Sequence, residues 1–280
     1  MAEMATITAS DVNKLRQQTG AGMMDCKNAL VEANGDFEQA VDILRKKGQK
    51  VAAKRGDREA NEGAVIAKTT ADGKKAVVIM LNCETDFVAK NENFVAFAEE
   101  ILNVAADKTP ANVDELKALT LADGRTVSDH ITDNIGKIGE KIDLGAYEIV
   151  NGEQAVAYIH PGNRLATIVS LNKSGENIED AGKQVAMQVA AMDPVAVDET
   201  SVTQETIDRE LEIGKELARQ EGKPEEMIDK IAQGKLKKFF KENTLVNQDF
   251  IRDNKKTVAQ FLKDTADGLK VVEFKRVTLG

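Results

Sequence analysis

The residues best suited to act on another molecule are Asp86 and Phe87, which stand side by side after an apolar run. A carboxylate can compete for polar groups or for a metal ion held by a partner, and an aromatic ring beside it can wedge into an apolar crevice. Two ordinary alternatives remain open. A phenylalanine after a strand commonly packs into the local core, and an aspartate before a helix commonly caps it.

The flanking segments predict how this pair is held. Residues 76–81 predict a buried strand, because the run is short, rich in β-branched side chains and free of Gly and Pro. Residues 92–102 carry apolar side chains at helical spacing. Asn91 or Asn93 is suited to cap the first N–H groups of that helix. We therefore expect a strand, a tight turn with Asp86 and Phe87, and a helix.

Other residues with chemical potential predict no catalytic or metal centre. Gly20-Ala21-Gly22 follows a helical pattern and lacks the Lys-Ser or Lys-Thr of a phosphate loop. Cys26 and Cys83 are the only cysteines, without a metal-binding spacing or a disulfide framework. His130 is expected at the surface without a partner, and the turn residue His160 lacks a nucleophile or acid. We expect no cofactor.

Composition narrows the class of partner. The chain has 280 residues, 42% hydrophobic and 30% charged, which suits a globular protein with a sizeable core. Its net charge of −9 argues against a general nucleic-acid binder and favours a protein partner. No apolar run has membrane-spanning length, and the first residues lack a signal-peptide pattern. We expect a cytoplasmic protein that binds neither nucleic acid directly nor membrane.

The first 57 residues predict a three-helix module followed by a basic linker. Thr8 with Asp11 forms a capping-box pattern, and Gly35 separates the second helix from a third that Asp36 and Gln39 begin. Residues 46–58 are rich in Lys and Arg. An RNA contact is one interpretation of that run, and a solvated linker helix that tethers the module to the core is the interpretation we favour.

The remaining chain predicts an α+β core in two halves, residues 58–141 and 142–280. In the first half, strands around an Asp72-Gly73 turn form a hairpin, and helices follow at residues 93–106, 112–119 and 127–138. In the second half, Asn151-Gly152 predicts a hairpin between strands 144–150 and 154–159, followed by strand 164–171 and helix 178–192. Each half is expected to be an antiparallel sheet covered by helices.

A helical hairpin at residues 201–242 is predicted as an insertion in the second half. Two apolar stripes flank the turn Gly222-Lys223-Pro224, and charge is dense on the outer faces. Such a hairpin is a candidate projecting arm or self-association surface. A last helix at 257–266 and a closing strand at 271–279 complete the chain.

Three separated segments resemble the elongation factor Ts family: residues 15–30, 82–91 and 246–262. The first module is similar to the ubiquitin-associated (UBA) module that opens the family's members. The motifs occur in the family's order, so the resemblance extends over nearly the whole chain.

The resemblance implies a guanine-nucleotide exchange factor that binds GDP-bound and nucleotide-free elongation factor Tu, displaces Mg²⁺ and promotes GDP release without covalent chemistry. It implies a homodimer or a 2:2 complex through the helical hairpin. The residues that it implies for Mg²⁺ dislocation are Thr85, Asp86, Phe87 and Val88. The residues that it implies for partner contact are Arg16, Met23, Met24 and His160; of the adjacent methionines, which point about 100° apart on a helix, at least one is expected to be exposed.

Two departures and two rival functions accompany this interpretation. Some relatives carry histidines where this chain has Gln184 and Gln188, and others continue beyond the position of Gly280 with a helical module. A helical adaptor that binds proteins through residues 15–44 would explain the first module but not the turn at Asp86. An enzyme would need a cluster of His, Cys and carboxylates that the sequence does not display.

Overall fold

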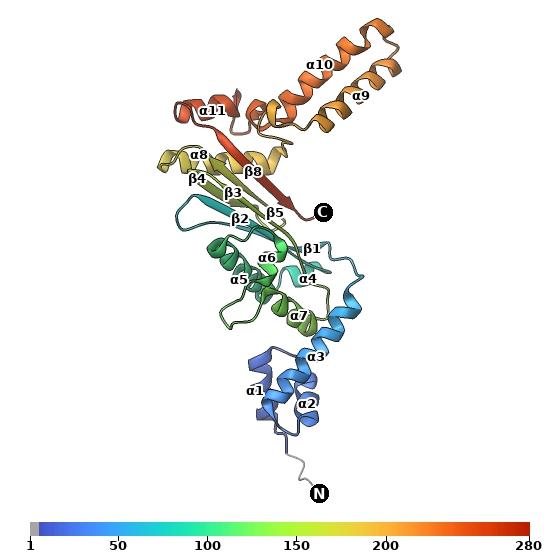
Figure 1. Ribbon diagram of the computed structural model, residues 1–280, viewed down its shortest axis with the longest axis vertical. Helices are drawn as coiled ribbons and strands as arrows, with labels where there is room; N and C mark the ends of the chain where they lie inside the picture. Colours follow the sequence, from blue (N-terminus) through green and yellow to red (C-terminus); the bar gives the residue numbers. More distant parts are fainter. Residues whose placement is uncertain (1–5) are drawn as a thin grey trace. The chain divides into compact units, whose positions relative to one another are not determined.

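The computed structural model describes residues 6–280 and contains two compact units. Unit 1 holds the described residues up to Val65 together with Ile79–Tyr147 and Leu279–Gly280; unit 2 holds Ile66–Val78 and Glu148–Thr278. Helices and antiparallel strands follow an N-terminal group of three helices, so the predicted α+β class is confirmed (Figure 1). The domain boundaries predicted at residues 57 and 141 stay predictions.

Unit 1 begins with α1 (Ala9–Thr19), α2 (Met23–Glu32) and α3 (Phe37–Arg55). The predicted capping box starts α1: Thr8 and Asp11 cap each other's backbone N–H groups. Gly20 ends the helix in the left-handed conformation (φ 68°), which glycine adopts without steric cost. Small and aliphatic side chains form the core of this module: Val12, Leu15, Ala21, Cys26, Ala29, Leu30, Ala33 and Ala40.

The basic stretch after residue 46 is the second half of α3, and it packs against α7 (Val127–Ile138). Gly48 is buried, and a Cβ added to Gly136 would lie 2.6 Å from the Gly48 Cα atom. The two backbones therefore approach more closely than side chains would allow. The lysines of this stretch are exposed, as expected of a solvated linker helix, while the face with Gly48 is packed.

The first sheet has the strand order β1 (Glu62–Thr69), β2 (Lys75–Cys83), β3 (Asp143–Asn151). The central strand β2 is buried along most of its length, which explains its continuous apolar sequence. After β2 come α4 (Asp86–Ala89), α5 (Glu92–Lys108) and α6 (Val113–Ala118). Asn91 caps α5 by accepting the N–H of Asn93, so one of the two predicted caps is confirmed.

The second sheet, in unit 2, is antiparallel with the order β4 (Gln154–Ile159), β5 (Leu165–Leu171), β8 (Val271–Thr278). Helix α8 (Glu176–Met192) packs against β4 and β5 (Figure 1). Val185 and Val189 of α8 share one core with Val169 of β5 and with Leu262 of α11 (Val258–Thr265). The closing strand β8 lies at one edge of the second sheet and pairs with its central strand β5.

The predicted hairpin at Asn151-Gly152 is wrong: β3 belongs to the first sheet and β4 to the second. Backbone hydrogen bonds explain the difference. The Gly152 N–H donates to the Lys74 carbonyl, and the Glu153 N–H donates to the Leu171 carbonyl. Because the N–H groups of Gly152 and Glu153 bond to Lys74 and Leu171 rather than to β3, the chain does not fold back along β3 but continues into the second sheet.

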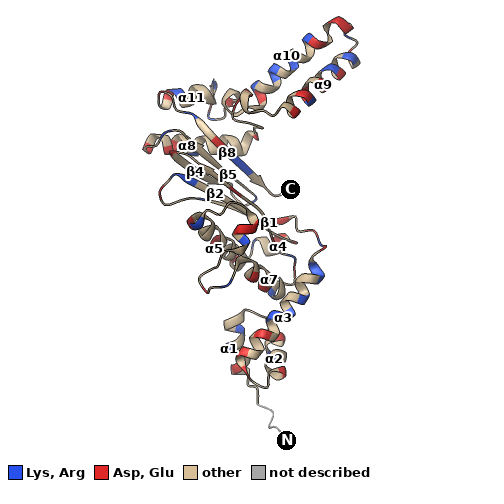
Figure 2. Cartoon of the chain, in the orientation of Figure 1, with Lys and Arg blue, Asp and Glu red and all other residues tan. Residues whose placement is uncertain are grey.

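A helical hairpin formed by α9 (Gln204–Gln220) and α10 (Glu225–Asn243) follows α8 in unit 2 (Figure 1). Gly214 and Ala232 face each other at its centre, and a Cβ on Gly214 would lie 3.2 Å from the Ala232 Cα atom. Small residues thus allow close helix packing. Acidic and basic residues are spread along both helices (Figure 2). Short elements complete the unit: η1 (Glu199–Ser201), η2 (Leu245–Asn247), β6 (Asp249–Phe250) and β7 (Asp253–Thr257).

Exchange of Gly136 for alanine tests the contact between α3 and α7. We expect G136A to lower the free energy of unfolding by about 1–3 kcal/mol, the usual cost of overpacking, despite alanine's better helix propensity. G234A is the matched control in α10, because a Cβ at Gly234 meets nothing within 4 Å. It should raise the same quantity by up to about 1 kcal/mol. Urea unfolding measures both; equal behaviour of the two variants would contradict the contact.

Candidate partner-contact site

Phe87 lies on the short helix α4 and is 83% exposed. No residue of α4 is buried, so the alternative in which Phe87 packs into the local core is wrong for this structure. A large exposed aromatic side chain is costly in water and is typical of a contact surface. The ring is therefore free to enter a crevice of another molecule.

Thr85 caps α4. Its hydroxyl oxygen accepts the Val88 N–H at 3.4 Å, and its carbonyl accepts the Ala89 N–H at 3.2 Å. The carbonyl also accepts the Cys83 thiol at 3.2 Å. Burial raises the pKa of this thiol to about 12, so Cys83 stays protonated and acts as a donor rather than as a nucleophile.

Asp86 occupies the first turn of α4 beside Phe87, and its carboxylate lies 2.6 Å from the Lys90 ammonium. This hydrogen bond lowers the pKa of Asp86, so the side chain is negatively charged at neutral pH. Both partners are substantially exposed, at 49% for Asp86 and 77% for Lys90. Exposed ion pairs contribute little stability, so the Asp86 carboxylate can exchange Lys90 for groups of a partner.

Glu84, just before the turn, joins distant segments of unit 1. Its carboxylate accepts the Lys141 backbone N–H at 2.7 Å and lies 3.2 Å from the guanidinium groups of Arg55 and Arg58. The hydrogen bond from the Lys141 N–H lowers the pKa of Glu84 below its usual range, and the positive charge of Arg55 lowers it further. Glu140 in turn accepts the Thr85 N–H at 3.0 Å.

Sequence reasoning missed this group of residues. Arg55 and Glu84 are 29 positions apart and Glu84 and Glu140 are 56 positions apart, so no local motif joins them. Single charged residues in a chain this rich in charge carry no signal of their own. The only hint was the position of Glu84 directly beside the candidate turn.

The other predicted contact residues of unit 1 lie on α1 and α2. Met23 and Met24 are 51% and 63% exposed, because Cys26, Ala29 and Leu30 form the inner face of α2. At least one exposed methionine was expected, and both are exposed. Arg16 is also exposed, near the end of α1. These side chains provide an adaptable apolar surface with a cation nearby in the sequence.

His160 belongs to unit 2 and lies in the turn between β4 and β5. It is exposed, and its Nδ1 atom lies 3.0 Å from the Tyr158 hydroxyl. Its backbone N–H donates to the Leu165 carbonyl and closes the turn. The ring is thus held by a neighbour but remains open to solvent.

The expectation that His130 has no partner is wrong. Its Nε2 atom lies 3.0 Å from an Asp123 carboxylate oxygen, and its ring centroid lies 6.3 Å from that of Phe97. Asp123 lies in the loop before α7, seven residues before His130. The polar sequence around His130 gave no sign that this loop turns back towards the helix.

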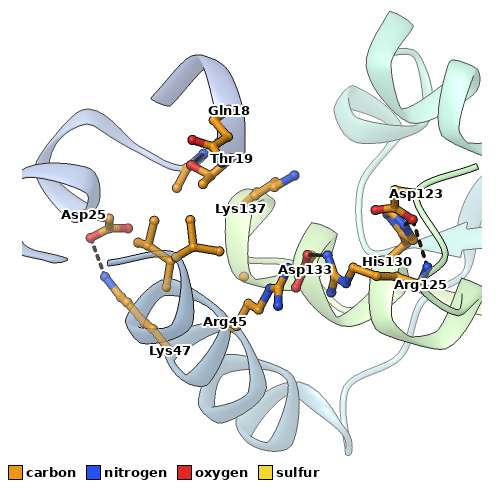
Figure 3. Close-up of a pocket in the computed structure, with 15 residues that line it drawn as sticks. Gln18, Thr19, Asp25, Arg45, Lys47, Asp123, Arg125, His130, Asp133 and Lys137 are labelled. Atoms are coloured by element: carbon orange, nitrogen blue, oxygen red, sulfur yellow. Dashed lines mark hydrogen bonds and ion pairs between the residues drawn. The ribbon is translucent and has the colours of Figure 1, made fainter. Parts of the chain in front are cut away.

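His130 also lines a cavity of about 230 Å³ in unit 1, between the α1–α2 turn, α3 and α7 (Figure 3). Two ion pairs line it, Asp25 with Lys47 and Arg125 with Asp133, together with the hydrogen bond between Asp123 and His130. Arg45 and Lys137 also line the cavity, so four basic side chains face three carboxylates when His130 is neutral. Among residues 6–280, no group of three or more His, Cys, Asp or Glu side chains could hold a metal ion.

Comparison with known proteins identifies the family to which the chain is similar. The model of the family described as elongation factor Ts matches residues 84–280, from Glu84 through the exposed turn to the end of the chain. The chain is 55% identical to elongation factor Ts of Porphyromonas gingivalis over 273 residues, 98% of each chain. The chain belongs to the elongation factor Ts family.

Other members of the elongation factor Ts family are similar over comparable lengths. The chain is 53% identical to elongation factor Ts of Christiangramia forsetii, over 99% of this chain and all of that protein. It is 45% identical to the protein of Chloroherpeton thalassium, over 99% of each. Family membership makes this chain a translation elongation factor.

The two glutamines noted as departures within the elongation factor Ts family lie in different environments of α8. Gln188 is fully buried; it donates to the Gln248 side chain and the Asp249 carbonyl and accepts the Ile251 N–H. Its role is structural. Gln184 has intermediate exposure.

Among the described residues, no helix has the length and apolar character needed to span a bilayer.

The lowered pKa of Glu84 predicts a pH dependence of stability. Its folded-state pKa lies below the usual 4.5, so its stabilising effect is complete above pH 4.5 and is lost as the pH falls through the folded-state pKa. Urea unfolding at a series of pH values should therefore find E84Q less stable than wild type at pH 7, with the difference shrinking in acid. E226Q, at an exposed position of α10, controls for loss of one negative charge. A difference independent of pH would contradict the assignment.

Proposed function

We propose that this member of the elongation factor Ts family is the guanine-nucleotide exchange factor of elongation factor Tu. It binds the GDP-bound factor, displaces Mg²⁺ and promotes GDP release, so that GTP can bind. The observation that carries the proposal is the exposed Phe87 beside the charged Asp86 on a capped turn. An exposed aromatic and a carboxylate together suit a partner site that contains both an apolar crevice and a metal.

In this proposal Phe87 inserts between helices of the GTPase domain near the bound Mg²⁺, and Asp86 competes for polar groups there. Mg²⁺ sites depend on strict octahedral geometry, so a small shift of the surrounding groups weakens metal binding. Loss of the metal removes the positive charge that holds the diphosphate, and GDP leaves. Thr85 and Val88 support this step through the capping hydrogen bond that shapes the turn.

Contacts away from the turn would add affinity and orientation. We assign Arg16, Met23 and Met24 of the first module to one contact on elongation factor Tu, and His160 to another. Methionine side chains adapt to irregular apolar surfaces, and the exposure of both methionines supports this role. Two contacts on one partner raise the effective concentration of each.

Binding energies explain how the complex is released. If the exchange factor weakens GDP binding by a given ratio, GDP weakens binding of the exchange factor by the same ratio. Nucleotide rebinding therefore expels the factor. The protein acts in the cytoplasm, without covalent chemistry of its own, and on a protein rather than on nucleic acid or membrane.

Release of fluorescent GDP from cognate elongation factor Tu, followed by stopped flow, tests the proposal. Wild type should accelerate release strongly. F87A should reduce the acceleration about tenfold or more, since truncation of a central interface aromatic costs about 2 kcal/mol or more. D86A combined with F87A should leave release near its basal rate.

V272A is the matched control, because Val272 of β8 is an apolar residue that is 52% exposed but lies outside the turn. It should behave as wild type. Acceleration that survives in the double variant would contradict the role of the turn, and wild type without acceleration would contradict the exchange function.

We also propose that the α9–α10 hairpin mediates a homodimer or a 2:2 complex with elongation factor Tu. Three apolar side chains of the hairpin support this: Ile213, Leu217 and Met227 are 45%, 43% and 45% exposed. L217E should shift the mass measured by light scattering from two copies to one, because a buried unpaired carboxylate is costly. A wild-type mass of one copy, alone and with elongation factor Tu, would contradict the proposal.

A further inference from the structure

Two segments of unit 1 bind each other through exchanged side-chain-to-backbone hydrogen bonds. Glu140, after α7, accepts the backbone N–H groups of Glu84 at 3.1 Å and Thr85 at 3.0 Å, and the Thr85 hydroxyl at 2.7 Å. In return, the Glu84 carboxylate accepts the Lys141 N–H at 2.7 Å. We call residues 84–85 and 140–141, joined in this way, the glutamate clamp. Hydrogen bonds to a charged acceptor are the stronger kind.

The end of α3 is attached to the same clamp. Arg55 donates to both carboxylate oxygens of Glu84 at 3.2 Å, and Arg58 donates to one of them at 3.2 Å. The Lys141 ammonium donates to the carbonyls of Gly56 and Arg58 at 2.8 Å each. Three segments distant in the sequence therefore meet directly before Asp86.

Packing gives helix α4 little support. It is four residues long, and none of them is buried, so packing does not fix its orientation. Its cap, Thr85, is the residue that Glu140 holds by both N–H and hydroxyl. The same hydroxyl oxygen accepts the Val88 N–H. One carboxylate thus accepts both the N–H and the hydroxyl of the residue that caps α4.

We propose that Glu140 is the positioning residue of the exposed turn: it does not touch the partner, but it holds Thr85 so that Asp86 and Phe87 are presented in one orientation. This inference rests on the proposed exchange function. A misplacement of about 1 Å in a reacting group can cost about a hundredfold in rate, so the orientation of the ring decides the rate of exchange more than the affinity of the complex.

The first test measures the hydrogen bonds of the clamp directly and does not depend on GDP release. Amide hydrogen exchange, resolved by residue, should be slow at Glu84 and Thr85 in wild type and at least about tenfold faster in E140A, because local opening then no longer breaks these bonds. E140Q, which keeps one carbonyl acceptor, should restore part of the protection. Unchanged protection in E140A would overturn the clamp.

The second test separates positioning from stability. With GDP-loaded elongation factor Tu, E140A should lower the maximal rate of GDP release at saturating factor by about tenfold or more. The concentration for half-maximal release should stay within about threefold of wild type. A merely structural role would produce the opposite: partly unfolded protein raises the half-saturating concentration and leaves the maximal rate intact. E140Q should recover most of the rate.

E115A is the matched control, since Glu115 also accepts a backbone N–H in unit 1, from Ala111 at 2.8 Å, but does not touch the turn. It should keep the wild-type maximal rate. Faster amide exchange in E140A with an unchanged maximal rate would overturn the positioning role alone. Wild type that leaves GDP release at its basal rate would overturn the proposed function, while the amide-exchange result would still report on the clamp.

Discussion

A four-residue helix whose side chains stay out of the core has to be fixed from its ends. Isolated helices of this length do not persist in water, because one turn fixes several dihedral angles for a single hydrogen bond. In this chain the helix is stabilised at its N-cap, where Thr85 makes the capping bond and is also held by Glu140. The exposed position of Phe87 thus depends on polar contacts on the other side of the same turn.

The remaining structure of unit 1 serves the same turn. The buried strand β2 delivers the chain to Cys83, and the thiol, protonated because of its burial, ties that residue to the Thr85 carbonyl. Helix α3, packed on α7 at Gly48 and Gly136, ends at Arg55, which pairs with Glu84. The three-helix module and the turn are therefore linked through one long helix, whose second half is the predicted linker.

Much of this arrangement could be predicted from the sequence, where the signals are local. Caps at Thr8 and Asn91, the apolar run of β2 and the stripes of the helical hairpin each depend on residues a few positions apart. The Asn151-Gly152 pair misled, because the turn signal specifies a bend but not the strand that receives the chain. The bonds of Glu140 could not be predicted at all, since they arise only when residues 56 positions apart meet.

The buried amides of Gln188 and Gln248 carry a consequence for the history of the family. Gln188 donates to the Gln248 side chain, and Gln248 donates to the carbonyls of Met192 and Glu242. Replacement of one amide leaves the other with an unsatisfied group in the core, and selection acts against such intermediates. These two positions are therefore expected to evolve as a pair. A change at Gln188 therefore favours a matching change at Gln248, because only a matched pair leaves no amide group without its partner.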